Sequence, residues 1–278
     1  MKKQAMELDW LVGRGAVVGM LHVGALPGTP RAAMSMQQLI DRTCDEARVY
    51  LQAGVDALAI ENMHDIPYVR APLGPEVVAS MTAVGCAVRA LSTAPVGVQI
   101  LAGGGNEALA VAHASGLDFV RVEGFVFAHV ADEGLFDACA GELLRYRKAI
   151  GAERVAVFAD IKKKHSSHAI TADVDIVETA HAAEFFLADG MIVTGVSTGA
   201  PTDLAELEAV KAATKTPVLV GSGVTFDNVQ AYLPLADGLI VGSHFKRHGC
   251  WSEAVDADRV GRFMDKVRGL RSVATRGA

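Results

Sequence analysis

The sequence predicts an α/β fold, a single (β/α)₈ TIM barrel that spans residues 1–278. Three observations carry this prediction. Eight short apolar runs alternate with longer segments of helical periodicity, which is the pattern of a parallel sheet wrapped by helices. The length of 278 residues suits one such barrel. Hydrophobic residues make up 51% of the chain and charged residues 21%, which is ample material for one large core.

The expected strands share a local pattern. The phrases AGVDALAIEN (53–62), LADGMIVTG (187–195) and LADGLIVGS (235–243) each show a helix end, a tight turn, an apolar run and a polar or glycine exit. We expect strands at 16–21, 57–60, 96–100, 119–122, 156–159, 191–193, 218–220 and 239–241.

Helices are expected between these runs, with Asp or Pro near several of their starts. The predicted ranges are 37–52, 75–91, 107–114, 136–150, 173–187, 203–213 and 256–267. No linker interrupts the chain, and SVATRGA (272–278) is expected to be a short frayed tail. The rival fold is an open doubly wound sheet, whose GxGxxG signature should follow the first strand. HVGALPGTPR (22–31) lacks it, and LAGGGNEA (101–108), after the third strand, is weak evidence alone.

Charge and patterning limit the partners. A net charge of -6 provides no basic field for nucleic acid or an anionic membrane. The first apolar run is interrupted by Glu7, Asp9 and Arg14, so neither a signal peptide nor a membrane span is expected. The four cysteines form no CxxC pair, which indicates free thiols in a reducing compartment. We therefore expect a cytoplasmic protein.

Polar residues cluster where the predicted strands end, and in a barrel these ends open on one mouth. The candidates, in chain order, are His22, Glu61, Asn62, Gln99, Arg121, Glu123, Asp160, Lys164, His165 and Thr194. Each has a plainer interpretation: a histidine after a strand is often structural, a glutamine can cap a barrel layer, and KKK (162–164) can be a solvated loop. Because burying so many charges without use is costly, their convergence favours a site.

Two small-residue turns follow the last two predicted strands, Gly221-Ser222-Gly223 and Gly242-Ser243. In many barrels the loops after strands 7 and 8 offer backbone N–H groups to a phosphate. We therefore expect these five residues to bind the phosphate of a small-molecule ligand. The alternative is that the glycines only permit tight turns between strand and helix.

Five segments together resemble the BtpA/SgcQ family over about residues 16–268: VVGMLHVGALPGTPR, GVDALAIENMHDIPY, ADIKKKHSSHAI, VLVGSGVTFDNVQAYLPLADGLIVGSHFKRHG and VDADRVGRFM. The resemblance implies a phosphate-binding type of TIM barrel. One branch of that family is linked to photosystem I accumulation in cyanobacteria, and another lies in bacterial carbohydrate gene clusters. The family motifs match at Glu61-Asn62, followed by Asp65 and Pro67, and at Asp160, followed by Lys164-His165.

Two functional classes stay open. The first is an enzyme on a phosphorylated sugar or nucleoside, with Glu61, Asp160, Lys164 and Glu123 as catalytic residues and His22, Asn62, Gln99, Arg121, His165 and Thr194 around the substrate. The second is a non-catalytic assembly or regulatory factor, in which the barrel mouth is a vestigial or regulatory site. For the charged residues themselves, the alternative to catalysis is a salt-bridge network that ties loops together. The reaction stays open among isomerase, lyase, glycosyl or phosphoribosyl transfer and hydrolysis. A Walker A motif, an HExxH motif and a Ser-His-Asp order are absent.

Cofactor and assembly are less defined by the sequence. No cofactor is assigned, but a divalent metal is possible because His22, His64 and His165 lie near carboxylates without a specific ligand spacing. The apolar segment 75–91 can be covered by a second subunit, so we expect a homo-oligomer, although its stripe can equally pack on its own barrel.

Overall fold

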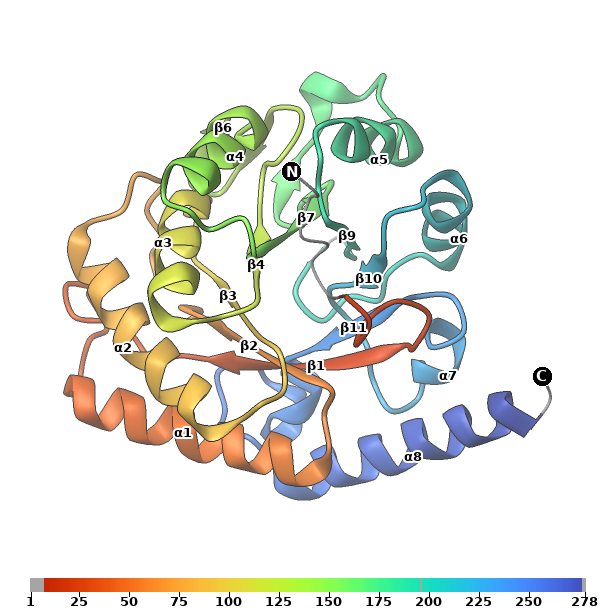
Figure 1. Cartoon of the computed structure of the whole chain (residues 1–278), viewed down its shortest axis with the longest axis horizontal. Coiled ribbons are helices and arrows are strands. Elements are labelled where there is room, and N and C mark those ends of the chain that lie inside the picture. Colours follow the sequence, from red (N-terminus) through yellow and green to blue (C-terminus); the bar gives the residue numbers. More distant parts are fainter. Residues whose placement is uncertain (1–7, 196, 277–278) are drawn as a thin grey trace.

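Eight parallel strands close into a barrel in the order β1-β11-β10-β9-β7-β4-β3-β2 (Figure 1). The computed structural model describes residues 8–195 and 197–276. Every apolar run expected to be a strand forms one, so the predicted (β/α)₈ barrel is confirmed as a single domain. The barrel strands are β1 (Ala16–His22), β2 (Ala57–Glu61), β3 (Val96–Gln99), β4 (Phe119–Val122), β7 (Ala156–Ile161), β9 (Gly190–Val193), β10 (Val218–Val220) and β11 (Gly238–Val241).

The helices surround the barrel (Figure 1) and have local starting signals in the sequence. Ser35 and Gln38 form a capping box at the start of α1, and the Asp175 and Asp203 side chains cap α5 and α6. The helix bounds are α1 (Met36–Ala53), α2 (Pro75–Leu91), α3 (Gly105–Ser115), α4 (Ala140–Ala149), α5 (Ile176–Phe185), α6 (Leu204–Ala213), α7 (Val229–Tyr232) and α8 (Ala257–Arg276).

Two helix predictions differ from the structure by four residues or more at one end. The helix expected from 136 begins at Ala140, because Phe136 belongs to a short strand. The last helix continues to Arg276 instead of ending at 267, so the expected frayed tail is helical as far as the structure describes it. An ion pair of 2.6 Å between Arg271 Nη2 and Asp56 Oδ2 ties this extension to the barrel. Residues 1–7, which begin the segment judged not to be a signal peptide, lie outside the described residues, as do 277 and 278.

A second, antiparallel sheet lies beside the barrel and was not predicted. It consists of β5 (His129–Ala131), β6 (Gly134–Phe136) and β8 (Ser166–Ser167), in the order β6-β5-β8. Strands of two or three residues contain too few positions for an alternating pattern to be recognised. The sheet joins the loop after β4 to the loop after β7, which carries Lys164. Three short 3₁₀ turns complete the loops: 169–171, 243–245 and 247–249.

Alternate residues of the strands fill the barrel interior, because successive side chains of a strand point to opposite faces. Trp10 stacks on Phe119 with ring centroids 5.7 Å apart, and Phe119 stacks on Phe158 at 5.0 Å. The other interior residues are small or aliphatic, such as Ala16, Val18 and Met20 of β1. This apolar plug fills the barrel below its mouth. No helix of the described chain is long and apolar enough to cross a membrane.

Candidate active site

The strand alternation brings the predicted polar residues to the mouth of the barrel. On β1 the interior positions 16, 18 and 20 are apolar, and the next interior position is His22. On β2, Ala57 and Ala59 are interior, so Glu61 follows in the same row. Phe119 precedes Arg121 on β4, and Phe158 precedes Asp160 on β7, in the same way. The side chains inside the barrel therefore change from apolar to polar at the mouth.

A cavity of about 200 Å³ opens at this level. Of the residues expected at the site, it is lined by His22, Glu61, Arg121, Lys164, Gly221, Ser222, Gly223, Gly242 and Ser243. Segments from both ends of the chain thus meet in one space, because the last strand, β11, pairs with the first, β1.

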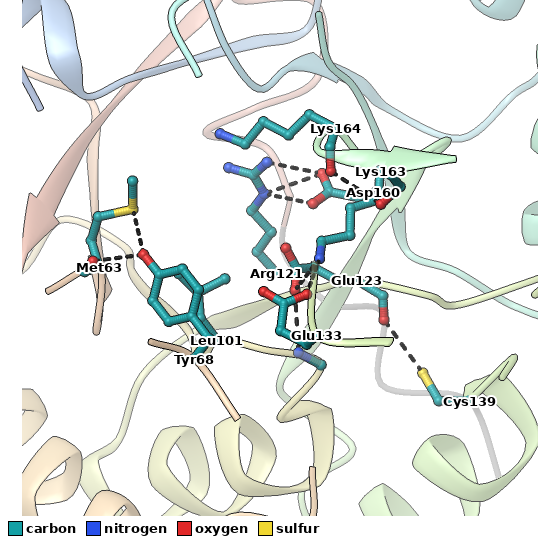
Figure 2. Close-up of polar contacts among 12 residues, drawn as sticks. Met63, Tyr68, Leu101, Arg121, Glu123, Glu133, Cys139, Asp160, Lys163 and Lys164 are labelled. Atoms are coloured by element: carbon teal, nitrogen blue, oxygen red, sulfur yellow. Dashed lines mark hydrogen bonds and ion pairs between the residues drawn. The ribbon is translucent and has the colours of Figure 1, made fainter. Parts of the chain in front are cut away.

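Arg121 and Asp160 form a buried ion pair beside the cavity. Arg121 Nε donates to both carboxylate oxygens of Asp160, at 3.1 and 3.2 Å, and Nη2 lies 3.1 Å from Oδ1 (Figure 2). Both side chains are almost completely buried, yet Nη2 has no acceptor with hydrogen-bond geometry within residues 8–195 and 197–276. The carboxylate therefore fixes the guanidinium and leaves part of it for a ligand.

His22 is held in one tautomer by the backbone. Its Nδ1 lies 2.9 Å from the carbonyl oxygen of Trp251, which can only accept, so Nδ1 carries the proton. Burial, reinforced by the charge of Lys246, lowers the pKa of His22 to about 3. The imidazole is therefore neutral near pH 7, and Nε2 presents a lone pair. Nε2 lies 3.7 Å from Glu61 Oε2, too far for a hydrogen bond.

Glu61 is buried and Lys164 is partly buried, and both positions disfavour the charged form. Burial raises the pKa of the Glu61 carboxyl, an effect that Arg121 and Lys164 only partly offset. Burial likewise lowers the pKa of the Lys164 ammonium. Within the described chain, the Glu61 carboxylate accepts no hydrogen bond from a protein donor. A ligand in the cavity can supply that donor.

The side chains of Lys163 and Lys164 point in different directions (Figure 2), and of these two only Lys164 lines the main cavity. Lys163 Nζ lies between two carboxylates, 3.7 Å from Glu123 Oε2 and 3.4 Å from Glu133 Oε2. Glu123 also accepts from the Gly103 amide at 3.2 Å. Burial raises the pKa of Glu123 to about 7, although Lys163 opposes the shift. This cluster fastens the loop that carries Lys164.

The two small-residue turns border the cavity with bare backbone. A Cβ atom on Gly221 would lie 3.2 Å from Arg121 Nη2, and one on Gly242 would lie 3.0 Å from His22 Nε2. The amide N–H groups that follow these glycines, those of Ser222, Gly223, Ser243 and His244, donate to no acceptor in the part of the chain that the structure describes. Unpaired N–H groups beside a cavity are the usual donors for an anion.

Gly223 has an additional, structural role. Its φ of 70° lies in the left-handed region, and a Cβ there would lie 2.1 Å from the carbonyl oxygen of Ala200. The glycine therefore allows the loop after β9 to cross the turn after β10. Both interpretations of this turn, close backbone packing and access for an anion, are compatible with the geometry.

Several expected residues do not line the main cavity. Asn62 braces two loops, since its amide donates to Asp65 and its carbonyl accepts from the Leu101 amide. His165 is exposed and accepts from the Thr198 amide. Gln99 and Thr194 are buried, and each has a side-chain oxygen without a partner among the described residues. Glu123 and Asp160 are likewise absent from the lining, and Asp160 instead borders a small second cavity of about 20 Å³.

Sequence reasoning missed four polar residues that line the cavity: Thr198, Thr225, His244 and Arg259. Arg259 Nε donates to the carbonyl oxygen of His244 at 2.8 Å, so α8 contributes a cation to the mouth. The sequence offers one signal for Arg259, because this residue lies in VDADRVGRFM, one of the five segments that resemble the BtpA/SgcQ family. No group of three metal-ligating side chains comes together within the described ranges, so the divalent metal stays a prediction.

Solved structures with low sequence identity share this fold. Thiamine phosphate pyrophosphorylase from Pyrococcus furiosus superposes with a TM-score of 0.58 at 17% identity, covering 93% of this chain and 98% of its own. KGPDC from Streptococcus mutans superposes with a TM-score of 0.59 at 12% identity, covering 92% and 98%. At these identities the similarity shows the TIM-barrel fold alone.

Sequence relatives cover nearly the whole chain. A mitochondrial, otherwise uncharacterized protein of Caenorhabditis elegans is 48% identical over 93% of this chain and 95% of its own. The photosystem I biogenesis protein BtpA of Synechocystis is 37% identical over 92% of this chain and 89% of its own. A profile of the BtpA family matches residues 14–269. The resemblance seen in the sequence motifs is thereby confirmed, and the chain belongs to the BtpA family.

Proposed function

We propose that this protein is an enzyme that holds a phosphorylated small molecule at the barrel mouth and transfers a proton with Glu61. One observation carries the proposal. The unpaired amides of the two glycine-serine turns border the same cavity as a buried carboxyl that has no protein donor among the described residues. An anion anchor and a proton-transfer group in one enclosed space are the minimum that acid–base catalysis on a phosphorylated substrate needs.

The phosphate is bound by backbone and cations in this proposal. The amides of Ser222, Gly223, Ser243 and His244 supply the N–H donors, and Arg259 approaches from α8. Arg121 Nη2, which has no partner with hydrogen-bond geometry among the described residues, lies next to Gly221 and borders the inner side of the same site. Charge-assisted hydrogen bonds of this kind are about twice as strong as neutral ones.

Glu61 is the group best placed to move a proton. Burial raises the pKa of the Glu61 carboxyl toward neutral pH. A general acid or base works best when its pKa lies near the pH of the reaction. Lys164 and Arg121 line the same cavity and stabilise the negative charge that develops when a proton leaves the substrate. Asp160 acts through Arg121 in this scheme, as a positioning residue. Glu123 is a positioning residue too, since it contacts Lys163 next to Lys164.

The comparisons support this proposal without specifying a reaction. Thiamine phosphate pyrophosphorylase and the phosphoribosyl anthranilate isomerases of Thermus thermophilus and Pyrococcus furiosus share the fold, and their names refer to phosphorylated compounds. We keep isomerase, lyase, transfer and hydrolysis chemistry open for this chain.

The second candidate is a non-catalytic assembly factor, which the name of the Synechocystis relative favours. An assembly factor has no need for a desolvated carboxyl beside unpaired amides, and this difference favours the enzyme. The homo-oligomer stays a prediction, since the buried face of α2 packs on its own barrel between α1 and α3. The cytoplasmic location also stays a prediction, because the nematode relative is mitochondrial.

A thermal-shift and calorimetric titration tests the proposal. Inorganic phosphate and ribose 5-phosphate should raise the melting temperature with the logarithm of their concentration above Kd. In Arg259→Met the affinity should fall about tenfold or more, since one charge-assisted contact is lost. The matched control is Arg262→Met on the same helix, where the guanidinium lies over the Phe226 ring outside the cavity. If neither inorganic phosphate nor ribose 5-phosphate binds, the proposal is wrong.

A further inference from the structure

Two hydrogen-bond acceptors face the cavity without donors, and together they describe the organic part of the substrate. His22 Nε2 has its lone pair exposed to the cavity because Nδ1–H donates to the Trp251 carbonyl. Glu61 Oε2 lies 3.7 Å away, so neither group satisfies the other. Both side chains are more than nine-tenths buried. Both acceptor atoms open on the cavity, where water can donate to them in the free protein, so a ligand that displaces this water has to supply donors of its own.

A divalent cation is the first ligand to consider for a neutral imidazole beside a carboxylate. A backbone carbonyl on Nδ1, as found here, is also the usual support of a metal-bound histidine. The charges around the cavity oppose this assignment. Arg121, Lys164 and Arg259 are the cations in the lining, and Glu61 is the single carboxylate there among the described residues. At the short distances inside such a cavity, an excess of positive charge repels a dication and attracts an anion.

Neutral hydroxyl groups fit both acceptors and the charge. An imidazole nitrogen has one lone pair in the ring plane and accepts one hydrogen, and the carboxylate accepts another. One hydroxyl carries one hydrogen, so two donors are needed to satisfy two acceptors. The separation of 3.7 Å between Nε2 and Oε2 lets two neighbouring hydroxyls of one molecule each reach one acceptor.

We infer that the substrate is a polyhydroxy phosphate ester, with one hydroxyl donating to His22 Nε2 and a neighbouring hydroxyl donating to the Glu61 carboxylate, and with no divalent cation between them. The inference rests on the proposed function, because the phosphate anchor decides which part of the ligand reaches these two side chains. It makes His22 a specificity-determining residue. In the same arrangement, Glu61 lies within reach of the proton that it transfers.

The test compares two phosphate esters that differ in hydroxyl groups. Ribose 5-phosphate carries hydroxyls along its carbon chain, and n-pentyl phosphate has the same number of carbons and none. We expect n-pentyl phosphate to bind at least tenfold more weakly to the wild-type protein, because it leaves both acceptors buried and unpartnered. In His22→Ala the two affinities should approach each other. His22→Gln, whose amide oxygen can take the place of Nε2, should restore most of the difference.

The outcomes separate the inference from the proposed function. Equal affinity of the two esters in the wild-type protein would overturn the inference and leave the phosphate site intact. If neither ester binds, both the inference and the proposed function are overturned. The same titrations with EDTA and with added Mg²⁺ or Mn²⁺ should give the same ribose 5-phosphate affinity. A requirement for the metal would overturn the inference in favour of a cation held by His22 and Glu61.

Discussion

Arg121 donates through Nε to both oxygens of Asp160, at 3.1 and 3.2 Å, in an almost fully buried ion pair. The pair joins the ends of two neighbouring strands, β4 and β7, at the level of the cavity. It directs Arg121 Nη2 to the side of Gly221, where the proposed phosphate site begins. In the proposed function, Asp160 positions the Arg121 guanidinium, whose Nη2 has no hydrogen-bond partner among the described residues.

Asp160→Asn should lower both stability and ligand affinity. Loss of the carboxylate leaves a buried guanidinium without its counter-charge, which typically costs about 3–5 kcal/mol in unfolding free energy. We also expect phosphate affinity to fall about tenfold, because Arg121 is no longer held in place. Urea unfolding and calorimetric titration measure the two effects.

The matched control is Asp189→Asn, at the opposite end of the barrel. Asp189 accepts from Arg147 at 2.6 Å and from the Val157 amide at 3.0 Å. This variant should lose stability and keep the phosphate affinity. If the two variants weaken phosphate binding equally, the effect of Asp160 is general destabilisation and Arg121 is not a ligand contact.

Glu61→Gln should remove turnover while the fold stays intact. General acid–base catalysis contributes about 10²- to 10⁴-fold, so kcat should fall by at least about 10²-fold with any substrate found. Because the folded-state pKa of Glu61 is raised, ionising the carboxyl costs stability at neutral pH, and the neutral amide avoids that cost. The melting temperature at pH 7.5 should therefore be unchanged or higher. A large drop in melting temperature with unchanged kcat would identify Glu61 as structural.

Glu123 should make stability depend on pH. Its folded-state pKa of about 7 lies above the ordinary glutamate pKa of about 4.5, so the native protein binds more protons than the unfolded chain between these values. This contribution is complete below about pH 4.5 and is lost as the pH rises through 7, by roughly 3 kcal/mol at most. In Glu123→Gln the loss between pH 5 and pH 8 should largely disappear.

Urea unfolding at several pH values measures this dependence. Glu208→Gln, which changes an exposed carboxyl on α6, is the control and should follow the wild type. Parallel pH curves for wild type and Glu123→Gln would show that Glu123 has no raised pKa in the folded protein.

Gly223→Ala tests the close approach of two loops. The added Cβ would meet the Ala200 carbonyl oxygen at 2.1 Å, so the turn after β10 has to move. We expect lower stability together with weaker phosphate binding. Gly151→Ala is the control, since Gly151 has a similar φ of 72° but nothing within 4 Å of a Cβ. It should lose about 1–2 kcal/mol from the left-handed conformation and keep its affinity. Unchanged phosphate binding in Gly223→Ala would place the anion elsewhere.

The sequence predicted the barrel because each strand unit repeats one pattern and is buried on both faces. His22, Glu61 and Arg121 were expected at the mouth because they lie at the ends of the predicted strands, and all three line the cavity. What the pattern could not decide was the partner of each side chain. Asp160 and Glu61 occupy equivalent positions at strand ends, yet only Glu61 lines the main cavity, because Arg121 reaches across to Asp160.

Features that depend on several short segments were also beyond sequence reasoning. The β5-β6-β8 sheet pairs residues 130 and 167, and no local pattern in two or three residues indicates such a partner. Arg259 enters the cavity from α8 because this helix packs against α1 and the turn at 243–245, which is a tertiary contact. Adjacent lysines 163 and 164 look alike in the sequence, and only the carboxylates around the first distinguish them.

In the proposed function, a phosphate group binds between the turns after β10 and β11. A crystal structure of the protein with ribose 5-phosphate tests it most directly. We expect phosphate oxygens within hydrogen-bond distance of the Ser222 and Ser243 amides, with the sugar directed toward His22 and Glu61. A phosphate located away from these turns, or a cavity without ligand density in crystals saturated with the compound, would contradict it.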